Sequence, residues 1–171
     1  EDDFYDIMCG SGTIPLEAAL IAYNIPPRIL RNDYAFQKWD DYDSNLWKEL
    51  IDESNNKIND KNIINIFGSD LIDKNIQLCK SSMEKLSLKH HINFTTMDLS
   101  DFSPASTKGT IIINPPYGQR IGEQFNLNKL YKELGDKFKK GCSGHNVFIF
   151  TGDKNLSKTI GLRTKKRIIL K

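Results

Sequence analysis

The run Gly109-Thr110-Ile111-Ile112-Ile113 ends abruptly at Asn-Pro-Pro-Tyr, and this junction constrains the fold more than any other part of the chain. A short, apolar, β-branched run is typical of a central strand of a parallel sheet, which is buried on both faces. The two prolines after Asn114 fix the backbone and remove two N–H donors. We therefore predict a buried strand over residues 109–113 whose carboxyl end opens onto a rigid turn.

The same turn has the chemistry of a binding slot. Open α/β sheets bind their ligands at the carboxyl ends of strands, which is where Asn114 falls. Because Pro115 and Pro116 lack N–H groups, carbonyl oxygens and the Asn114 amide face one spot, with the Tyr117 ring beside them. These acceptors fit a planar group that carries an amino function. A rigid turn without a ligand also explains these four residues when they are taken alone.

A second junction lies near the start of the chain. We expect a strand over Phe4–Met8 and a helix over Ile14–Tyr23, joined by Cys9-Gly10-Ser11-Gly12-Thr13. Strand, glycine turn and helix form the nucleotide-binding entry of a doubly wound sheet, where glycines let the backbone approach a ligand and the helix offers N–H groups to a carboxylate. The turn matches neither Gly-x-Gly-x-x-Gly nor a phosphate loop, so a simple tight turn also explains it.

The rest of the chain alternates between strand and helix patterns. The predicted strands are 63–67, 92–97, 147–151 and 166–170, and the predicted helices are 44–57, 74–86, 127–139 and 155–160. This alternation predicts an α/β domain with a doubly wound, mostly parallel sheet and crossover helices on both faces. Residues 24–62 interrupt the pattern, and we interpret them as an aromatic-rich insertion.

Polar residues fall at or near the ends of four successive predicted strands. They are Asp6, Asp70, Asp98 and Asn114. Polar residues often begin loops, but four in a row beside a glycine turn indicate a ligand laid across one edge of the sheet. In a dinucleotide-binding unit the acidic residue that holds the ribose lies about 20 residues beyond the glycines, whereas Asp70 lies 58 beyond Gly12 because of the insertion. The acids nearer to that spacing end no predicted strand: Asp33, Asp40, Asp41 and Asp43.

Length and composition limit the class of protein that this chain can be. A chain of 171 residues can form one domain with a real core, and it holds no apolar run long enough to span a membrane. Its 3 cysteines are spread along the sequence and suggest neither a disulfide framework nor a zinc site, so we expect a reducing, cytoplasmic setting. His90, His91 and His145 lack ligand spacing, and we expect all three in loops or on the surface.

Charge is unevenly distributed along the chain. Residues 1–60 hold 5 basic and 13 acidic side chains, and residues 61–171 hold 19 basic and 9 acidic ones. A basic flank beside a site would suit a phosphate backbone, although a solvated surface explains it equally well. The late basic residues are Lys137, Lys139, Lys140, Lys154, Lys158, Arg163, Lys165, Lys166 and Arg167.

Together these motifs resemble the class I S-adenosylmethionine-dependent methyltransferases, and specifically the catalytic domain of the THUMP-containing RNA guanine-N2 methyltransferases. The matching runs cover nearly the whole chain: Asp6–Ala19, Tyr34–Trp39, Phe67–Asp70, Asn114–Gly118, Leu130–Gly135 and Phe150–Asp153. One departure is Ile7, where the family motif usually has proline. By this resemblance residues 1–171 are one catalytic domain, expected to be a fragment that lacks the family's last strand and the upstream THUMP module.

The resemblance implies a set of cofactor contacts. The methionine end of S-adenosylmethionine would lie over Gly10–Gly12 with Asp6 near its ammonium group, and Asp70 would take the ribose hydroxyls. Asp98 would accept from the adenine amino group between apolar walls. The full implied set is Asp6, Cys9, Gly10, Ser11, Gly12, Thr13, Asp70, Leu71, Asp98, Leu99 and Asn114. Cys9 lies in the cofactor turn and is interpreted as a small packed residue, not as a nucleophile.

The resemblance also implies the reaction. The catalytic set would be Asn114, Pro115, Pro116 and Tyr117, acting on a guanine of large-subunit ribosomal RNA, or of tRNA, without a metal and leaving S-adenosylhomocysteine. Asn-Pro-Pro-Tyr serves any planar amine, so an adenine-N6 methyltransferase acting on DNA or RNA stays open. A small-molecule or protein-glutamine methyltransferase would leave the basic part of the chain without a purpose. A domain that binds cofactor and RNA without turnover would not need intact Asn114 and Tyr117.

Overall fold

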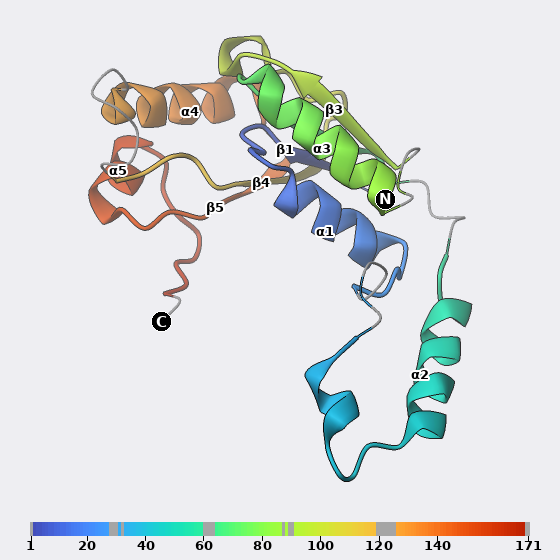
Figure 1. The fold of residues 1–171 in the computed structure, drawn as a ribbon. Helices are drawn as coiled ribbons and strands as arrows, with labels where there is room; N and C mark the ends of the chain where they lie inside the picture. Colours follow the sequence, from blue (N-terminus) through green and yellow to red (C-terminus); the bar gives the residue numbers. More distant parts are fainter. Residues whose placement is uncertain are drawn as a thin grey trace.

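The protein is described from a computed structural model that covers residues 2–27, 31, 33–59, 64–86, 88, 91–118 and 126–169. Its centre is a five-stranded, all-parallel sheet in the order β3-β2-β1-β4-β5 (Figure 1). The strands are β1 (Asp3–Asp6), β2 (Ile66–Asp70), β3 (Ile92–Thr96), β4 (Gly109–Ile113) and β5 (His145–Ile149). The chain order reverses beside β1, so the switch point of a doubly wound sheet lies between β1 and β4.

Helices cover both faces of the sheet, as Figure 1 shows. On one side lie α1 (Thr13–Ala22) and α3 (Asp73–Lys85), and on the other lie α4 (Leu127–Gly141) and the short α5 (Lys154–Thr159). Strand β1 contributes side chains to the cores on both faces of the sheet, because successive side chains point to opposite faces. Phe4 packs with the α1 and α3 cluster, whereas Tyr5 belongs to the cluster under α4.

Two apolar cores follow from this layering. Ala19, Ile66 and Cys79 are fully buried between the sheet and helices α1 and α3. Across the sheet, Ile113 and Leu134 are fully buried under α4. Burying a large aliphatic side chain contributes roughly 1.5–3 kcal/mol, so these two cores hold the helices against the sheet.

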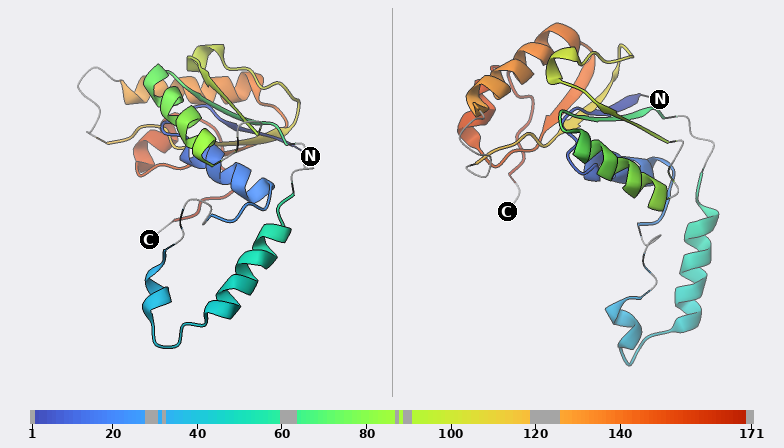
Figure 2. Two further views of the ribbon diagram at one scale, coloured as in Figure 1. Left: turned by 45° about the vertical axis from the view of Figure 1, so that its right-hand side comes forward. Right: turned by 45° about the horizontal axis from the view of Figure 1, so that its top comes forward.

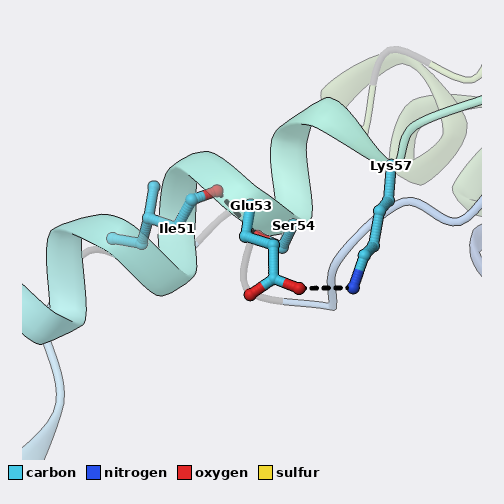
Figure 3. Close-up of polar contacts among 4 residues, drawn as sticks. All are labelled: Ile51, Glu53, Ser54 and Lys57. Carbon is cyan, nitrogen blue, oxygen red and sulfur yellow. Dashed lines mark hydrogen bonds and ion pairs between the residues drawn. The ribbon is translucent and has the colours of Figure 1, made fainter.

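The insertion forms an arm that stands away from the sheet, consisting of the 3₁₀ turn η1 (Ala35–Lys38) and helix α2 (Ser44–Asn56) (Figures 1 and 2). Helix α2 has no buried residue. Its polar side is exposed and carries two local contacts between residues drawn in Figure 3. Lys57 Nζ lies 2.6 Å from Glu53 Oε1, and the Ser54 hydroxyl donates to the Ile51 carbonyl. Phe36 is the centre of the arm's own aromatic cluster, and its ring lies 5.0 Å from that of Trp47.

Several predicted elements end elsewhere than expected. Strand β2 runs over 66–70, whereas we expected 63–67: residues 64 and 65 are outside the strand, and residue 63 lies outside the described part. The strand continues to Asp70 because Ser69 and Asp70 pair with Thr95 and Thr96. Strand β5 runs over 145–149 and not over 147–151, since its neighbour β4 ends at Ile113 before the two prolines. The expected sixth strand over 166–170 is wrong for 166–169, which are exposed and outside any strand; residue 170 lies outside the described part.

The prediction that the histidines lie in loops or on the surface is wrong for His145 and confirmed for His91, which lies in a turn. His145 begins β5, and its ring lies 5.9 Å from that of Tyr5 with both ring nitrogens shielded from solvent. His91 is half-buried, with its ring 4.0 Å from that of Tyr23. His90 lies outside the described residues. None of the described helices is both long and apolar enough to cross a membrane.

Candidate functional site

The site is built on the carboxyl edge of the sheet. Parallel pairing sets Asp6 opposite Gly68, Asp70 opposite Thr96, and Ile113 opposite Ile149. The chain segments that leave the five strands therefore begin along the same edge (Figure 1). The predicted site consists of the last residues of β1 and β2, Asp6 and Asp70, and of residues in the segments that follow β1 to β4. The roles of these residues are predictions.

The glycine turn after β1 is held by contacts that leave little freedom. Gly10 and Gly12 have φ angles of 53° and 84°, in the left-handed region that favours glycine. The Gly12 N–H donates to the Cys9 carbonyl at 2.8 Å, and a Cβ on Gly12 would lie 2.8 Å from Cys79 Sγ. Helix α1 then begins at Thr13 without a side-chain cap, so its first turn presents backbone N–H groups at this edge.

Asp70 ties this turn to the end of β2. Its Oδ2 accepts from the Gly10 N–H at 2.9 Å, and its Oδ1 accepts from the Ile72 N–H at 2.9 Å and from Asn75 Nδ2 at 3.0 Å. A carboxylate has about four acceptor sites, so one is left after these three contacts. Asp70 thus supports the loop that the sequence assigns to the cofactor, a role that sequence reasoning missed. A half-buried acid 60 residues from Gly10 gives no local signal for this contact.

Asp6 is a buried carboxylate at the switch point. Only 1% of the residue is exposed, and its Oδ1 accepts from the Met8 N–H at 3.2 Å. Burial raises the pKa of Asp6 from its usual 3.8 to about 7. The hydrogen bond from the Met8 N–H lowers this pKa, whereas repulsion from Asp70 raises it further. Such a group favours a cation beside it, because an opposite charge stabilises the ionised form.

Cys9 lies under the glycine turn and contacts a second cysteine. The Sγ atoms of Cys9 and Cys79 are 4.0 Å apart, and the Cys79 thiol donates to the Gly10 carbonyl at 3.3 Å. Spacing along the sequence does not signal this contact, and both cysteines are free thiols. The hydrogen bond with Cys79 and burial raise the pKa of Cys9 far above its usual range, so Cys9 stays a packed thiol.

The β3 end contributes a more open segment. Asp98 is exposed and caps the 3₁₀ turn η2 (Leu99–Asp101), because its Oδ1 accepts from the Ser100 N–H at 2.8 Å. Hydrogen bonding from Ser100 lowers the pKa of Asp98 and so favours the ionised carboxylate. Leu71 is exposed and Leu99 is half-buried. An exposed leucine at a strand end offers apolar surface, which fits its predicted contact with a ring.

The Asn-Pro-Pro-Tyr turn after β4 lies at the same edge. Asn114 is exposed and its amide hydrogen-bonds to none of the described residues, whereas Pro115 is fully buried and Pro116 half-buried. Tyr117 is 41% exposed. A buried proline therefore anchors a turn that presents one free amide and one aromatic ring to solvent. This is an arrangement of acceptors and a stacking surface, without a nucleophile or a strong base.

Two hollows of the described surface lie away from this edge. One is in the arm, lined by Phe36, Trp39 and Trp47 among others. The other lies between α1 and the amino-terminal part of the sheet and is lined mainly by apolar side chains; Thr13 is its one member from the predicted site. Among the described residues no cluster of three His, Cys, Asp or Glu side chains could hold a metal ion.

A switch-point glycine turn, an acid at the end of β2 and Asn-Pro-Pro-Tyr after β4 on this sheet define a class I S-adenosylmethionine-dependent methyltransferase fold. The chain matches the RMKL-like methyltransferase domain family over residues 1–171 and belongs to that family. The structure SMU.472, solved with S-adenosylhomocysteine and titled provisionally as a methyltransferase, is similar with a TM-score of 0.88 and 29% identity, over 97% of this chain and 44% of that one. The predicted fold class and cofactor are thereby confirmed.

Curated relatives are similar over nearly the whole chain. The Synechocystis sp. (strain PCC 6803) protein slr0064, whose name provisionally calls it an RNA methyltransferase, is 38% identical over 95% of this chain and 42% of its own length. The ribosomal RNA large subunit methyltransferase K/L of Legionella pneumophila (strain Philadelphia 1) is 34% identical over 97% of this chain and 23% of its own length. The chain thus spans less than half of these relatives.

Proposed function

We propose that this domain transfers a methyl group from S-adenosylmethionine to N2 of guanine in RNA, and that large-subunit ribosomal RNA is its substrate in preference to tRNA. The observation that carries the proposal is the Asn-Pro-Pro-Tyr turn, which presents the Asn114 amide and the Tyr117 ring on the same sheet edge as the glycine turn. The name of the Legionella relative supports the choice of RNA.

The described residues fit the cofactor. The first-turn N–H groups of α1 suit a carboxylate, and the buried Asp6, whose pKa is raised to about 7, suits an ammonium group. Asp70 keeps one acceptor site for a ribose hydroxyl while it holds Gly10 in place. Asp98, whose pKa is lowered, would accept from the adenine amino group. S-adenosylmethionine, when bound, supplies an electrophilic methyl group on a positively charged sulfur.

The chain's own residues activate the guanine amine by hydrogen bonding. The lone pair of an exocyclic amine is delocalised into the ring, so the nitrogen is a poor nucleophile. The Asn114 side-chain oxygen and the Pro115 carbonyl would each accept one amino proton, which stabilises the positive charge that develops on the nitrogen. As the new N–C bond forms and the methyl–sulfur bond breaks, the nitrogen loses one proton to solvent.

Tyr117 would hold the base in line. Stacking of an aromatic ring on a base contributes roughly 1–3 kcal/mol, and holding the two reactants in line supplies much of the remaining acceleration. A base that is paired in a helix must first be turned out of its stack. The basic residues of the later part of the chain, such as Lys154 and Lys158 on α5, would contact the RNA backbone.

The test is product analysis with the full-length protein. Ribosomal RNA without modifications is incubated with S-adenosylmethionine, digested to nucleosides and analysed by mass spectrometry for N2-methylguanosine. The wild type should form it. Asn114→Ala should reduce the rate at least about a hundredfold and leave cofactor affinity nearly unchanged, because the other expected cofactor contacts are kept. Asn93→Ala, which changes an exposed asparagine on β3, is the matched control and should be fully active.

The same experiment distinguishes guanine-N2 methylation from the alternative, adenine-N6 methylation. N6-methyladenosine as the product would overturn the choice of guanine while keeping the role of Asn114. Unimpaired transfer by Asn114→Ala would contradict that role for either base.

A further inference from the structure

The loop after β5 contacts the predicted stacking ring. An ideal Cβ placed on Gly152 would lie 2.8 Å from Tyr117 Cε2, 3.2 Å from Cδ2 and 3.4 Å from Cζ. These three atoms are consecutive along one side of the ring, so that side packs directly over the Gly152 Cα. The rest of the ring faces outward, since Tyr117 is 41% exposed. Any side chain at position 152 would occupy the space that the ring now fills.

The backbone does not explain why residue 152 is a glycine. The described glycines with φ in the left-handed region are Gly10, Gly12, Gly118, Gly144 and Gly161. Gly152 is not among them, so alanine could adopt its backbone conformation. Gly118, which follows Tyr117 in the sequence, does have such a φ, of 77°. At position 152 the feature that requires glycine is the missing Cβ.

The loop that carries Gly152 is fixed on both sides. The Phe150 N–H donates to the Ile113 carbonyl at 2.8 Å and ties the end of β5 to the end of β4. The Thr151 hydroxyl lies 3.0 Å from the hydroxyl of the fully buried Tyr131 and accepts from the Asp153 N–H at 3.2 Å. Asp153 in turn caps α5. The surface against which Tyr117 rests is therefore held by β4, α4 and α5.

From these contacts we infer that Gly152 is a positioning residue for methyl transfer: its bare Cα sets the height and tilt at which the Tyr117 ring meets the target base. This inference rests on the proposed function, because Tyr117 matters only if a base stacks on it. A residue in the loop after β5 would thus control the geometry of the slot after β4. The two positions are 35 residues apart in sequence.

The contact itself is tested without RNA. The full-length protein is labelled with 3-fluorotyrosine, and Tyr117→Phe identifies the Tyr117 signal in the ¹⁹F spectrum. Gly152→Ala should shift and broaden that signal because the ring leaves its present place. Gly141→Ala is the matched control, since a Cβ there meets no atom within 4 Å, and it should leave the signal unchanged. An unchanged Tyr117 signal in Gly152→Ala would overturn the inference, whatever reaction the protein catalyses.

The consequence is tested by a double-mutant cycle in the methyl-transfer assay. Gly152→Ala should raise KM for RNA about tenfold and leave S-adenosylmethionine affinity unchanged, as expected when base stacking is disturbed. In a Tyr117→Ala background the same change should alter kcat/KM less than about twofold, because the partner is gone. Equal losses in both backgrounds would overturn the inference and indicate a general defect. A wild type without methyl transfer would instead contradict the proposed function, and the ¹⁹F result would still decide the contact.

Discussion

The two halves of the carboxyl edge are built in different ways. The first half, here called the cofactor half for its proposed role, comprises residues 6–13 and 70–72. The target half comprises residues 114–118 and 150–153. In the cofactor half, a buried acid and a hydrogen-bonded acid fix a left-handed glycine turn against Cys79. In the target half, Asn114 and Tyr117 extend into solvent from a buried proline.

Because of this difference, we expect substitutions in the two halves to have different effects on stability and on the reaction. Changes in the cofactor half should affect both folding and ligand binding, because the same atoms serve both. Changes to the exposed side chains of the target half should affect the reaction alone. Enzyme sites often combine a rigid support with accessible reacting groups, and here the two functions fall on opposite sides of the switch point.

The largest effect is expected from Gly12→Ala. The new methyl group would meet Cys79 Sγ at 2.8 Å and Phe94 at 3.3 Å, and the φ of 84° is unfavourable for alanine. We expect a loss of roughly 2–4 kcal/mol in the free energy of unfolding, measured in urea. Gly118→Ala in the target half also has a left-handed φ but open space around it, so it should lose only about 1–2 kcal/mol. Equal losses would mean that the cofactor half is not the more tightly packed one.

Asp70→Ala should be the next most severe. It removes three hydrogen bonds, including the one from the Gly10 N–H, together with the proposed ribose contact. Titration calorimetry should show S-adenosylmethionine binding weakened by about tenfold or more, which a charge-assisted contact of roughly 1.5–3 kcal/mol requires. Asp98→Ala is the control at the exposed β3 end and should weaken binding less. The reverse order would show that the β3 end contributes more to binding than Asp70.

The pH dependence of cofactor binding should reflect Asp6. Its pKa is raised to about 7, so the carboxyl is largely neutral at pH 6 and half ionised at pH 7. The ammonium group of the cofactor favours the ionised form, and affinity should rise about fivefold over this interval, in which the ammonium itself stays protonated. Asp6→Asn should bind more weakly with little pH dependence. A wild-type affinity that does not change between pH 6 and 7 would contradict the assignment.

The raised pKa of Asp6 also makes the stability of the fold depend on pH. The folded protein holds the Asp6 proton to higher pH than the unfolded chain, whose carboxyl titrates near its usual 3.8. The contribution of Asp6 to stability is therefore fully present below about pH 4 and is lost as the pH rises through about 7. Urea unfolding of wild type and Asp6→Asn at pH 5 and pH 8 measures this, and the wild type should lose more stability than the variant.

Much of the edge could be predicted because its signals are local. A β-branched run followed by Asn-Pro-Pro, and glycines between a strand and a helix, identify strand ends from a few neighbouring residues. Strand limits were less accurate, since the pairing partner decides where β2 and β5 stop. The contacts that support the site were missed altogether. Asp70 with Gly10, and Cys9 with Cys79, join residues 60 and 70 positions apart, and no periodicity encodes such distances.

The smallest effect on stability is expected from a change of Asn114, the residue with the central proposed role in methyl transfer. Asn114→Ala removes an exposed amide that hydrogen-bonds to none of the described residues. The free energy of unfolding should therefore change by no more than about 0.5 kcal/mol, although methyl transfer should fall at least about a hundredfold. Urea unfolding beside the activity assay tests both statements on one preparation. A variant that is both inactive and clearly destabilised would remove the distinction between the two halves, because Asn114 would then support the fold as Asp70 does.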